Sequence, residues 1–219
     1  SSRKADLPML QIIDPASWPR RNTFAEFMEL DCSFALTRSL SVSAFLRHLR
    51  DNGLRFYPSF TWAATAAVNA HKEFRMGLDE EGRPGYYDVV HPEYTVLDPR
   101  TRNMDSLNTP FDREFSRFYA AMTGDLDRFR LEGVHTPSRE NSILLSCVPW
   151  YSYTGLSFHM KSSRSFLRPM LIWGKYEERE GNALPFTIQV HHAAADGYHC
   201  HLLFQTLEEI LEHPGQFLV

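Results

Sequence analysis

The stretch formed by residues 184–211, LPFTIQVHHAAADGYHCHLLFQTLEEIL, changes its pattern twice and decides the fold. Its first part favours a buried strand that ends at His191, and its last part, residues 199–211, repeats apolar side chains at helical spacing. Between them, His191 and His192 lead into three alanines, and Asp196-Gly197 turns the chain into the helix. Adjacent strand residues point to opposite faces, so one histidine can face a cleft while the other faces the interior.

Upstream of this stretch, the periodicity predicts both helices and strands. We expect helices over residues 18–28, 43–52 and 58–71, and another that places Phe111, Phe115, Phe118 and Met122 on one face. We expect strands near residues 33–36 and within 75–97, on either side of a turn at 79–85. Further strands are expected over 143–148, 156–160 and 170–176. The last of these would be joined to the strand at 184–191 through Glu180-Gly181-Asn182. Without a regular βαβ alternation, these elements predict an α+β sandwich.

The composition bounds the class of protein. The 219 residues carry a formal net charge of −4, so we expect no nucleic-acid partner, which would require a basic face. No uninterrupted apolar run reaches about 18 residues, so we expect neither a transmembrane helix nor a membrane partner. Cys32, Cys147 and Cys200 show no CxxC spacing and favour buried thiols in a reducing cytoplasm. The length suits a single domain over residues 1–219.

Three hypotheses fit the paired histidines when this stretch is considered alone. In the first, both imidazoles are hydrogen-bonded structural groups, and Asp196 starts a turn or caps the helix. In the second, His192 and Asp196 bind a metal ion; their spacing permits this only on a helix, and the glycine that follows argues against it. In the third, a neutral imidazole accepts a hydroxyl proton as a general base. The residues by themselves leave the choice open, although we expect no metal.

Seven short motifs occur along the chain. They are Trp18-Pro19-Arg20-Arg21, Arg55-Phe56-Tyr57-Pro58, NAHKEFRM at 69–76, HPEYTV at 91–96, SCVPW at 146–150, Gly174-Lys175-Tyr176 and HHAAADG at 191–197. Their order and spacing resemble those of chloramphenicol acetyltransferases, whose signatures include W-x-R-[RK], [KR]-F-Y-P and HHxxxDG. A chance match to one such motif is easy, whereas seven in register are specific to this family.

The resemblance implies a fold and a mechanism. The implied fold is that of CoA-dependent acyltransferases, an α+β two-layer sandwich in which helices cover a mixed β-sheet. His192 would take the proton of a substrate hydroxyl, which attacks the thioester of acetyl-CoA in a ternary complex. Ser146 would donate to the oxyanion, and Asp196 would pair with Arg20 to hold the histidine in place. Without the resemblance, Ser146 is typical of an ordinary strand serine and Arg20 of a solvated helix start.

The resemblance also implies binding residues and an assembly. Coenzyme A would contact Tyr57, Trp150, Tyr176 and Lys175. The acceptor, chloramphenicol or a similar hydrophobic alcohol, would contact Phe27, Cys32, Phe34, Met104 and Phe158, although such apolar residues are more often plain core. The implied assembly is a homotrimer with active sites at subunit interfaces, and the implied biological role is antibiotic resistance.

Three residues depart from the family pattern near the acceptor. Ile172 stands where threonine is usual, Met104 where an aromatic residue is common, and Phe158 where leucine is usual. We therefore expect intact transfer chemistry beside a remodelled acceptor site.

Several alternatives remain open. They are an acyltransferase with a different acceptor, a non-catalytic member that binds a small apolar ligand, and a hydrolase with Cys147 or Ser146 as nucleophile. The acyltransferases of 2-oxo acid dehydrogenase complexes resemble the chain less, because their motif usually lacks the double histidine.

Overall fold

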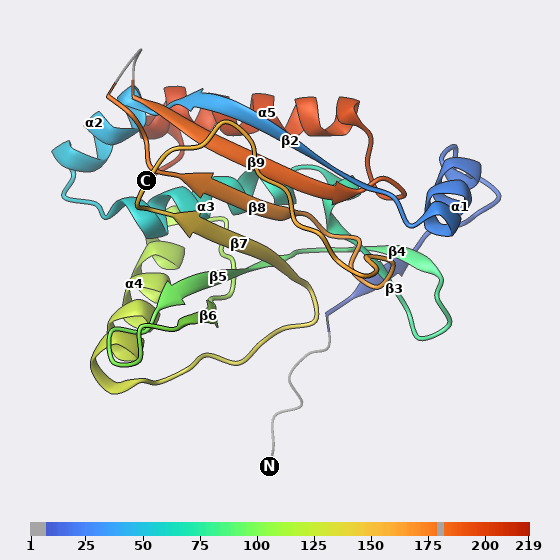
Figure 1. The fold of residues 1–219 in the computed structure, drawn as a ribbon, viewed down its shortest axis with the longest axis horizontal. Coiled ribbons are helices and arrows are strands. Elements are labelled where there is room, and N and C mark those ends of the chain that lie inside the picture. The colour runs from blue at the N-terminus through green and yellow to red at the C-terminus, as the bar shows by residue number, and fades with distance from the viewer. Residues whose placement is uncertain (1–7, 179–181) are drawn as a thin grey trace.

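The computed structural model describes residues 8–178 and 182–219. Its main element is a mixed sheet with the strand order β2-β9-β8-β7-β5-β6 (Figure 1). These strands are β2 (Ser33–Ser41), β9 (Ala183–His191), β8 (Met170–Gly174), β7 (Ser142–Val148), β5 (His91–Leu97) and β6 (Met104–Asn108). β7 runs parallel to β5 and β8, and the other neighbours are antiparallel. The expected α+β class is confirmed.

Helices cover one face of this sheet (Figure 1). They are α2 (Ser43–Asp51), α3 (Phe56–Asn69), α4 (Phe115–Glu132) and α5 (Gly197–Glu212). α3 packs against both α4 and α5, and most of its residues are buried. A helix that is apolar on all sides needs such neighbours, which explains why the alanine-rich sequence of α3 lies at the centre of the helical layer.

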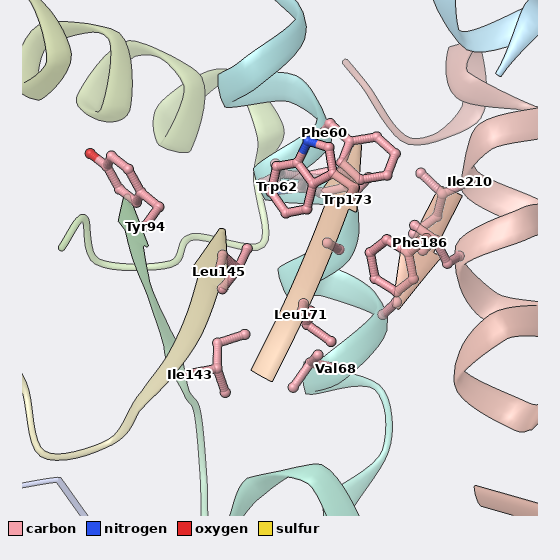
Figure 2. Packing of buried hydrophobic residues seen from close by; sticks show 14 of the residues in the cluster. Phe60, Trp62, Val68, Tyr94, Ile143, Leu145, Leu171, Trp173, Phe186 and Ile210 are labelled. Atoms are coloured by element: carbon pink, nitrogen blue, oxygen red, sulfur yellow. The ribbon is translucent and has the colours of Figure 1, made fainter. Parts of the chain in front are cut away.

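Alternation along the strands separates a core face from an open face. On β9, Phe186 is fully buried beneath the helices, and Thr187 points to the other side of the sheet. The core face is drawn in Figure 2, which labels Leu145, Leu171, Trp173 and Phe186 of the strands near Phe60 and Val68 of α3. Burying a large apolar side chain contributes about 1.5–3 kcal/mol. This face therefore fixes the strand register, and the register in turn places the polar residues of the open face.

A segment without helix or strand, residues 149–169, crosses the open face (Figure 1); we call it the covering segment. The Tyr153 hydroxyl donates to the carbonyl oxygen of Ile172 on β8 at 2.8 Å. The side-chain amide of Gln189 on β9 bonds both backbone groups of Phe158, at 2.6 and 3.0 Å. The expected strand over 156–160 is wrong, because a side chain and not a neighbouring strand satisfies the backbone there.

A smaller sheet and α1 (Arg21–Leu30) lie at one end of the main sheet (Figure 1). This sheet has the order β1 (Leu10–Ile12), β4 (Pro84–Tyr87), β3 (Met76–Leu78), and 3₁₀ turns span Lys72–Arg75 and Pro214–Gln216. Trp18, Phe24 and Met28 belong to a separate apolar cluster that contains Ala194. The cluster joins the N-terminal region to the loop that follows β9.

Most other expected elements are present with shifted ends. α1 begins at Arg21 and not at Trp18, because residues 18–20 form a turn before it. α4 begins at Phe115, so Phe111 lies outside the helix, although it still packs against the core. In the expected turn before β9, Glu180 and Gly181 lie outside the described residues, and Asn182 has a left-handed φ of 56°.

The strand β6 was not expected from the sequence, since its residues, MDSLN, are poor in β-branched and aromatic side chains.

Among the described residues, no helix is both long and apolar enough to cross a membrane.

Candidate active site

The loop after β9 is held by the backbone of the neighbouring strand region. β9 ends at His191, which pairs with Ser33 of β2, and the next amide, of His192, donates to the Cys32 carbonyl oxygen at 2.8 Å. Residues 193–195 are fully buried alanines, so larger side chains there would have to displace their neighbours. Asp196 then caps α5, with its own amide donating to His199 Nδ1 at 2.9 Å.

The His192 ring lies between two aromatic side chains. It stacks on Phe27 with a centroid distance of 3.8 Å and an interplanar angle of 3°, and it meets Phe34 edge-on at 4.9 Å. Its side chain stays 29% exposed. Nδ1 lies 3.3 Å from Asp196 Oδ1, but the two atoms are not aligned for a hydrogen bond. The imidazole is thus fixed by stacking and remains reachable from solvent.

Arg20 joins the turn before α1 to the histidine loop. Its guanidinium forms an ion pair with Asp196 Oδ2 and donates to the carbonyl oxygens of His192 at 3.2 Å and Ala193 at 3.3 Å. Arg20 and Asp196 are 176 residues apart in sequence, so this contact depends on the whole fold. An arginine that bonds both a carboxylate and two loop carbonyls restricts the backbone on either side of His192.

His191 takes a different role from its neighbour. Its side chain is completely buried, and burial lowers its pKa. Nδ1 accepts the amide hydrogen of Ala193 at 3.1 Å, so Nε2 carries the hydrogen and faces Asp31 Oδ1 at 3.3 Å. His191 therefore supports the loop from the interior while His192 faces outward.

Asp31 is a site residue that the sequence analysis missed. The hydroxyl of Ser162, the amide and hydroxyl of Ser163 and the imidazole of His191 donate to its carboxylate and lower its pKa to about 2. The backbone of Asp31 adopts the left-handed conformation, with φ 49°, at the point where α1 ends. An aspartate three residues after the expected helix of residues 18–28 was the available signal, since Asp tolerates this conformation better than most residues.

Ser146 occupies the open face of the sheet, on β7. Its hydroxyl lies 3.3 Å from the Thr95 hydroxyl of β5, and its backbone pairs with Ile172 of β8. A cavity of about 320 Å³ opens beside it, lined by Glu93, Thr95, Ser106, Leu144, Leu145, Ser146, Phe158, Met170, Leu171 and Ile172. The structure thus brings Phe158 to Ser146, whereas Phe27, Cys32 and Phe34 lie at His192.

A larger cavity, of about 530 Å³, lies between the start of α3, α4 and the ends of β5 and β7. Tyr57, Trp150 and Met104 line it together, so Met104 is grouped with two coenzyme A candidates and not with the other acceptor candidates. The Tyr57 hydroxyl donates to the Thr95 carbonyl oxygen at 2.5 Å, and burial raises its pKa. Thr95 is common to the linings of both cavities.

Lys175 and Tyr176 are not among the residues that line this cavity. The Lys175 amide donates to the Tyr151 carbonyl oxygen at 3.1 Å, which places Lys175 beside the turn that carries Trp150. The Tyr176 ring lies 6.3 Å from the Phe56 ring, and Phe56 does line the cavity. Both residues are thus neighbours of the cavity walls.

Within one chain, Ser146 and His192 lie far apart. Ser146 pairs with Ile172, which pairs with Thr187, so Ser146 is two strands away from a position four residues before His191. Strand spacings of about 4.8 Å and rises of about 3.3 Å put the Cα atoms of Ser146 and His191 roughly 16 Å apart. The two side chains of a single chain are too distant to act on one carbonyl group.

The nucleophile and metal hypotheses find little support in this geometry. Cys147 packs toward the core cluster, and burial raises its pKa to about 12, so the reactive thiolate is scarce at neutral pH. The described residues contain no group of three or more histidine, cysteine or carboxylate side chains arranged to hold a metal ion. Asp196, the second proposed ligand, is already engaged by Arg20.

Comparison with known proteins gives one consistent family. The sequence model described as chloramphenicol acetyltransferase matches residues 9–208. A chloramphenicol acetyltransferase from Staphylococcus aureus is 31% identical, covering 94% of this chain and 98% of its own, and one from Streptomyces acrimycini is 34% identical, covering 96% and 98%. A solved chloramphenicol acetyltransferase structure superposes with a TM-score of 0.83 at 24% identity, covering 93% of this chain and all of its own; it bears on the fold alone.

Proposed function

Because the chain belongs to the chloramphenicol acetyltransferase family, we propose that it moves an acetyl group from acetyl-CoA to a hydroxyl of chloramphenicol or of a similar hydrophobic alcohol. The observation that carries the proposal is the His192 ring, which is stacked, partly exposed and flanked by the Arg20–Asp196 pair. An imidazole held in this way is suited to accept a hydroxyl proton.

In the proposed reaction, His192 takes the proton of the acceptor hydroxyl as its oxygen attacks the thioester carbonyl. The carbonyl oxygen then carries the negative charge, and the Ser146 hydroxyl donates a hydrogen bond to it. When the tetrahedral intermediate collapses, the C–S bond breaks and the protonated imidazole returns its proton to the leaving thiolate. The acetyl ester and free coenzyme A are released, and neither Ser146 nor Cys147 is acylated.

We further propose that each active centre uses His192 of one chain and Ser146 of another, within a homotrimer. The separation of roughly 16 Å within one chain supports this arrangement, because both groups must touch the same tetrahedral centre. Ser146 lies on the open face, so a second chain could approach it without displacing the helical layer.

For coenzyme A, we propose the larger cavity. Its apolar lining, with the Tyr57 and Trp150 rings, fits a narrow pantetheine chain and an adenine ring. Lys175, beside the Trp150 turn, can meet a phosphate group, with Tyr176 next to it. Phe27, Cys32 and Phe34 of the histidine side would face Phe158 and the Ser146 cavity across the same acceptor.

A thiol-release assay with acetyl-CoA and chloramphenicol tests the activity. We expect coenzyme A thiol and an acetyl ester to appear in equal amounts. Binding of the alcohol without any thiol release would instead favour the non-catalytic member of the fold, for which Ile172 beside Ser146 is the motivating residue.

A mixing experiment tests the shared centre. His192→Ala and Ser146→Ala chains should each lose about 10²-fold or more of their activity separately, but after they are unfolded and refolded together, about one quarter of the interfacial centres should combine an intact histidine with an intact serine. Recovery of activity toward that fraction supports the interface. If every mixture stays as inactive as its parents, each chain builds its own centre and the arrangement is wrong.

A further inference from the structure

The cavity beside Ser146 contains a carboxylate. Among the described residues that line it, Glu93 of β5 is the one charged side chain, and its neighbours are mainly apolar. Phe158, Met170 and Ile172 form apolar walls around it. Glu93 is half-buried and its side-chain contacts are exposed, so its carboxylate borders both the cavity and solvent.

Within the part of the chain that the structure describes, the Glu93 carboxylate has two hydrogen-bond partners and both bonds are weak. The hydroxyls of Ser106 and Ser138 donate to the two carboxylate oxygens, each at 3.3 Å, which is long for such a bond. No lysine, arginine or histidine in residues 8–178 or 182–219 forms an ion pair with Glu93. Arg139, adjacent to Ser138 in sequence, donates instead to Asn108 Oδ1 at 2.6 Å. The carboxylate thus keeps free acceptor positions.

The strand register fixes how far Glu93 lies from the reacting centre. Glu93 pairs with Leu144, and Ser146 is two residues farther along β7 on the same face. One strand spacing and two rises put the Cα atoms of Glu93 and Ser146 roughly 8 Å apart. One small molecule can therefore contact both residues.

We propose that Glu93 selects an acceptor alcohol that carries a protonated amine at about this distance from the hydroxyl to be acetylated. The inference rests on the proposed transfer reaction and adds to it a class of acceptor that differs from neutral chloramphenicol by a positive charge. The ammonium group binds the Glu93 carboxylate, an apolar or aromatic linker contacts Phe158 and Ile172, and the hydroxyl lies near Ser146. Glu93 is thus a specificity-determining residue of the acceptor cavity.

A matched pair of alcohols tests the proposal. Para-aminomethylbenzyl alcohol holds an ammonium group across a ring from its hydroxyl, and para-ethylbenzyl alcohol has the same shape with a methyl group in place of the ammonium. We expect kcat/KM for ester formation to favour the amine by about tenfold or more in the unaltered protein. Equal values, or a preference for the neutral alcohol, would overturn the proposal.

Two variants assign the preference to Glu93. Glu93→Gln keeps the shape and removes the charge, so the preference for the amine should fall to near unity. Asp105→Asn removes a carboxylate from neighbouring β6 that pairs with His135 at 3.6 Å and does not line the cavity, so the preference should persist. If the preference for the amine survives Glu93→Gln, or if Asp105→Asn abolishes it equally, the preference comes from the overall charge of the protein. Either result contradicts the proposal.

The outcome can be separated from that of the proposed function. If neither alcohol nor chloramphenicol is acetylated, the transfer reaction has failed, and calorimetric binding of the two alcohols then decides the role of Glu93. Tighter binding of the amine that Glu93→Gln removes supports the role, and equal binding refutes it. If acetyl transfer occurs without a preference for the amine, the transfer proposal stands and this inference fails.

Discussion

The histidine loop and the Ser146 cavity are built in different ways. Around His192, many groups are bonded to one another: the His192 amide to the Cys32 carbonyl oxygen at 2.8 Å, the Arg20 guanidinium to two loop carbonyl oxygens, and the Ala193 amide to the buried imidazole of His191 at 3.1 Å. Around Ser146, the polar contacts are long, at 3.3 Å to Thr95 and at 3.3 Å from Ser106 to Glu93. One region is a network with several mutual restraints, and the other is an apolar cavity with a few loosely bonded groups.

The difference matches what the proposed reaction asks of each region. A general base must be held within a fraction of an ångström of its working position, because small displacements lower the rate steeply. An acceptor cavity needs shape and a few polar contacts, which different apolar residues can provide. Changes in the histidine loop should therefore reduce turnover with every acceptor, whereas changes in the cavity should alter which acceptor is used.

The largest effect should come from His192→Ala, which removes the proposed base. We expect kcat to fall by about 10²–10⁴-fold with every acceptor tested. His201→Ala, an exposed histidine of α5, is the matched control and should keep its activity. If kcat of the His192→Ala enzyme stayed within tenfold of the unaltered value, the histidine loop would have no part in the chemical step. The contrast between the two regions would then fail.

Ser146→Ala tests whether the cavity side also takes part in the chemical step. Loss of one oxyanion donor should lower kcat by about 10²-fold while KM for the acceptor changes little. Steady-state kinetics at saturating acetyl-CoA separate the two parameters. A change mainly in KM would make Ser146 a binding residue only, so that the cavity would supply no chemistry.

Asp196→Asn measures how far the restraint of the loop matters. The variant weakens the ion pair with Arg20, so we expect a loss of about 1–2 kcal/mol in the free energy of unfolding, together with a roughly tenfold lower kcat. Urea unfolding and turnover are measured on the same preparations, and Arg20→Gln completes a double-mutant cycle. A variant of full stability that is nearly inactive would show a direct chemical role for Asp196.

Asp31→Asn should have the smallest effect on activity, a few-fold, and a characteristic dependence on pH. Bonds from Ser162, Ser163 and His191 lower the pKa of Asp31 from 3.8 to about 2. A carboxyl group with a lower pKa in the folded state stabilises the fold above its unfolded pKa, and this contribution disappears as the pH falls through the folded value. The stability difference between the unaltered protein and the variant should thus shrink between about pH 5 and pH 2 in urea unfolding. A difference that does not depend on pH would exclude the carboxylate network as its source.

Patterns local in sequence were sufficient to predict the fold class and most elements. The alternation before His191, the helical spacing after His199 and the apolar run of α3 each reflect burial against the rest of the protein. The covering segment was misread because residues 156–160 look like a strand until the Gln189 side chain is known to bond them. β6 was missed because it pairs with β5 through its backbone, with little strand propensity of its own.

In the candidate site too, local motifs predicted some features, and others depend on contacts between residues that are distant in sequence. Arg20, Asp196 and His192 were named from motifs, and the structure places them in contact. The partnership of Asp31 with His191 could not be read from the sequence, because it joins the end of α1 to the end of β9, 160 residues away. Met104 was grouped with the acceptor candidates, but β6 carries it to the cavity of Tyr57 and Trp150. Residue types indicate chemistry, and only the register shows which types meet.

The way in which the backbone of Phe158 is attached to the sheet has a consequence for the substitutions that this position tolerates. Gln189 bonds the amide and carbonyl of that residue and makes no use of its ring. Nearly any amino acid except proline can therefore occupy the position without releasing the chain from the sheet. Since Phe158 also lines the Ser146 cavity, substitutions at this position should change the shape of that wall while the backbone stays attached, and libraries that aim at other acceptors should begin there.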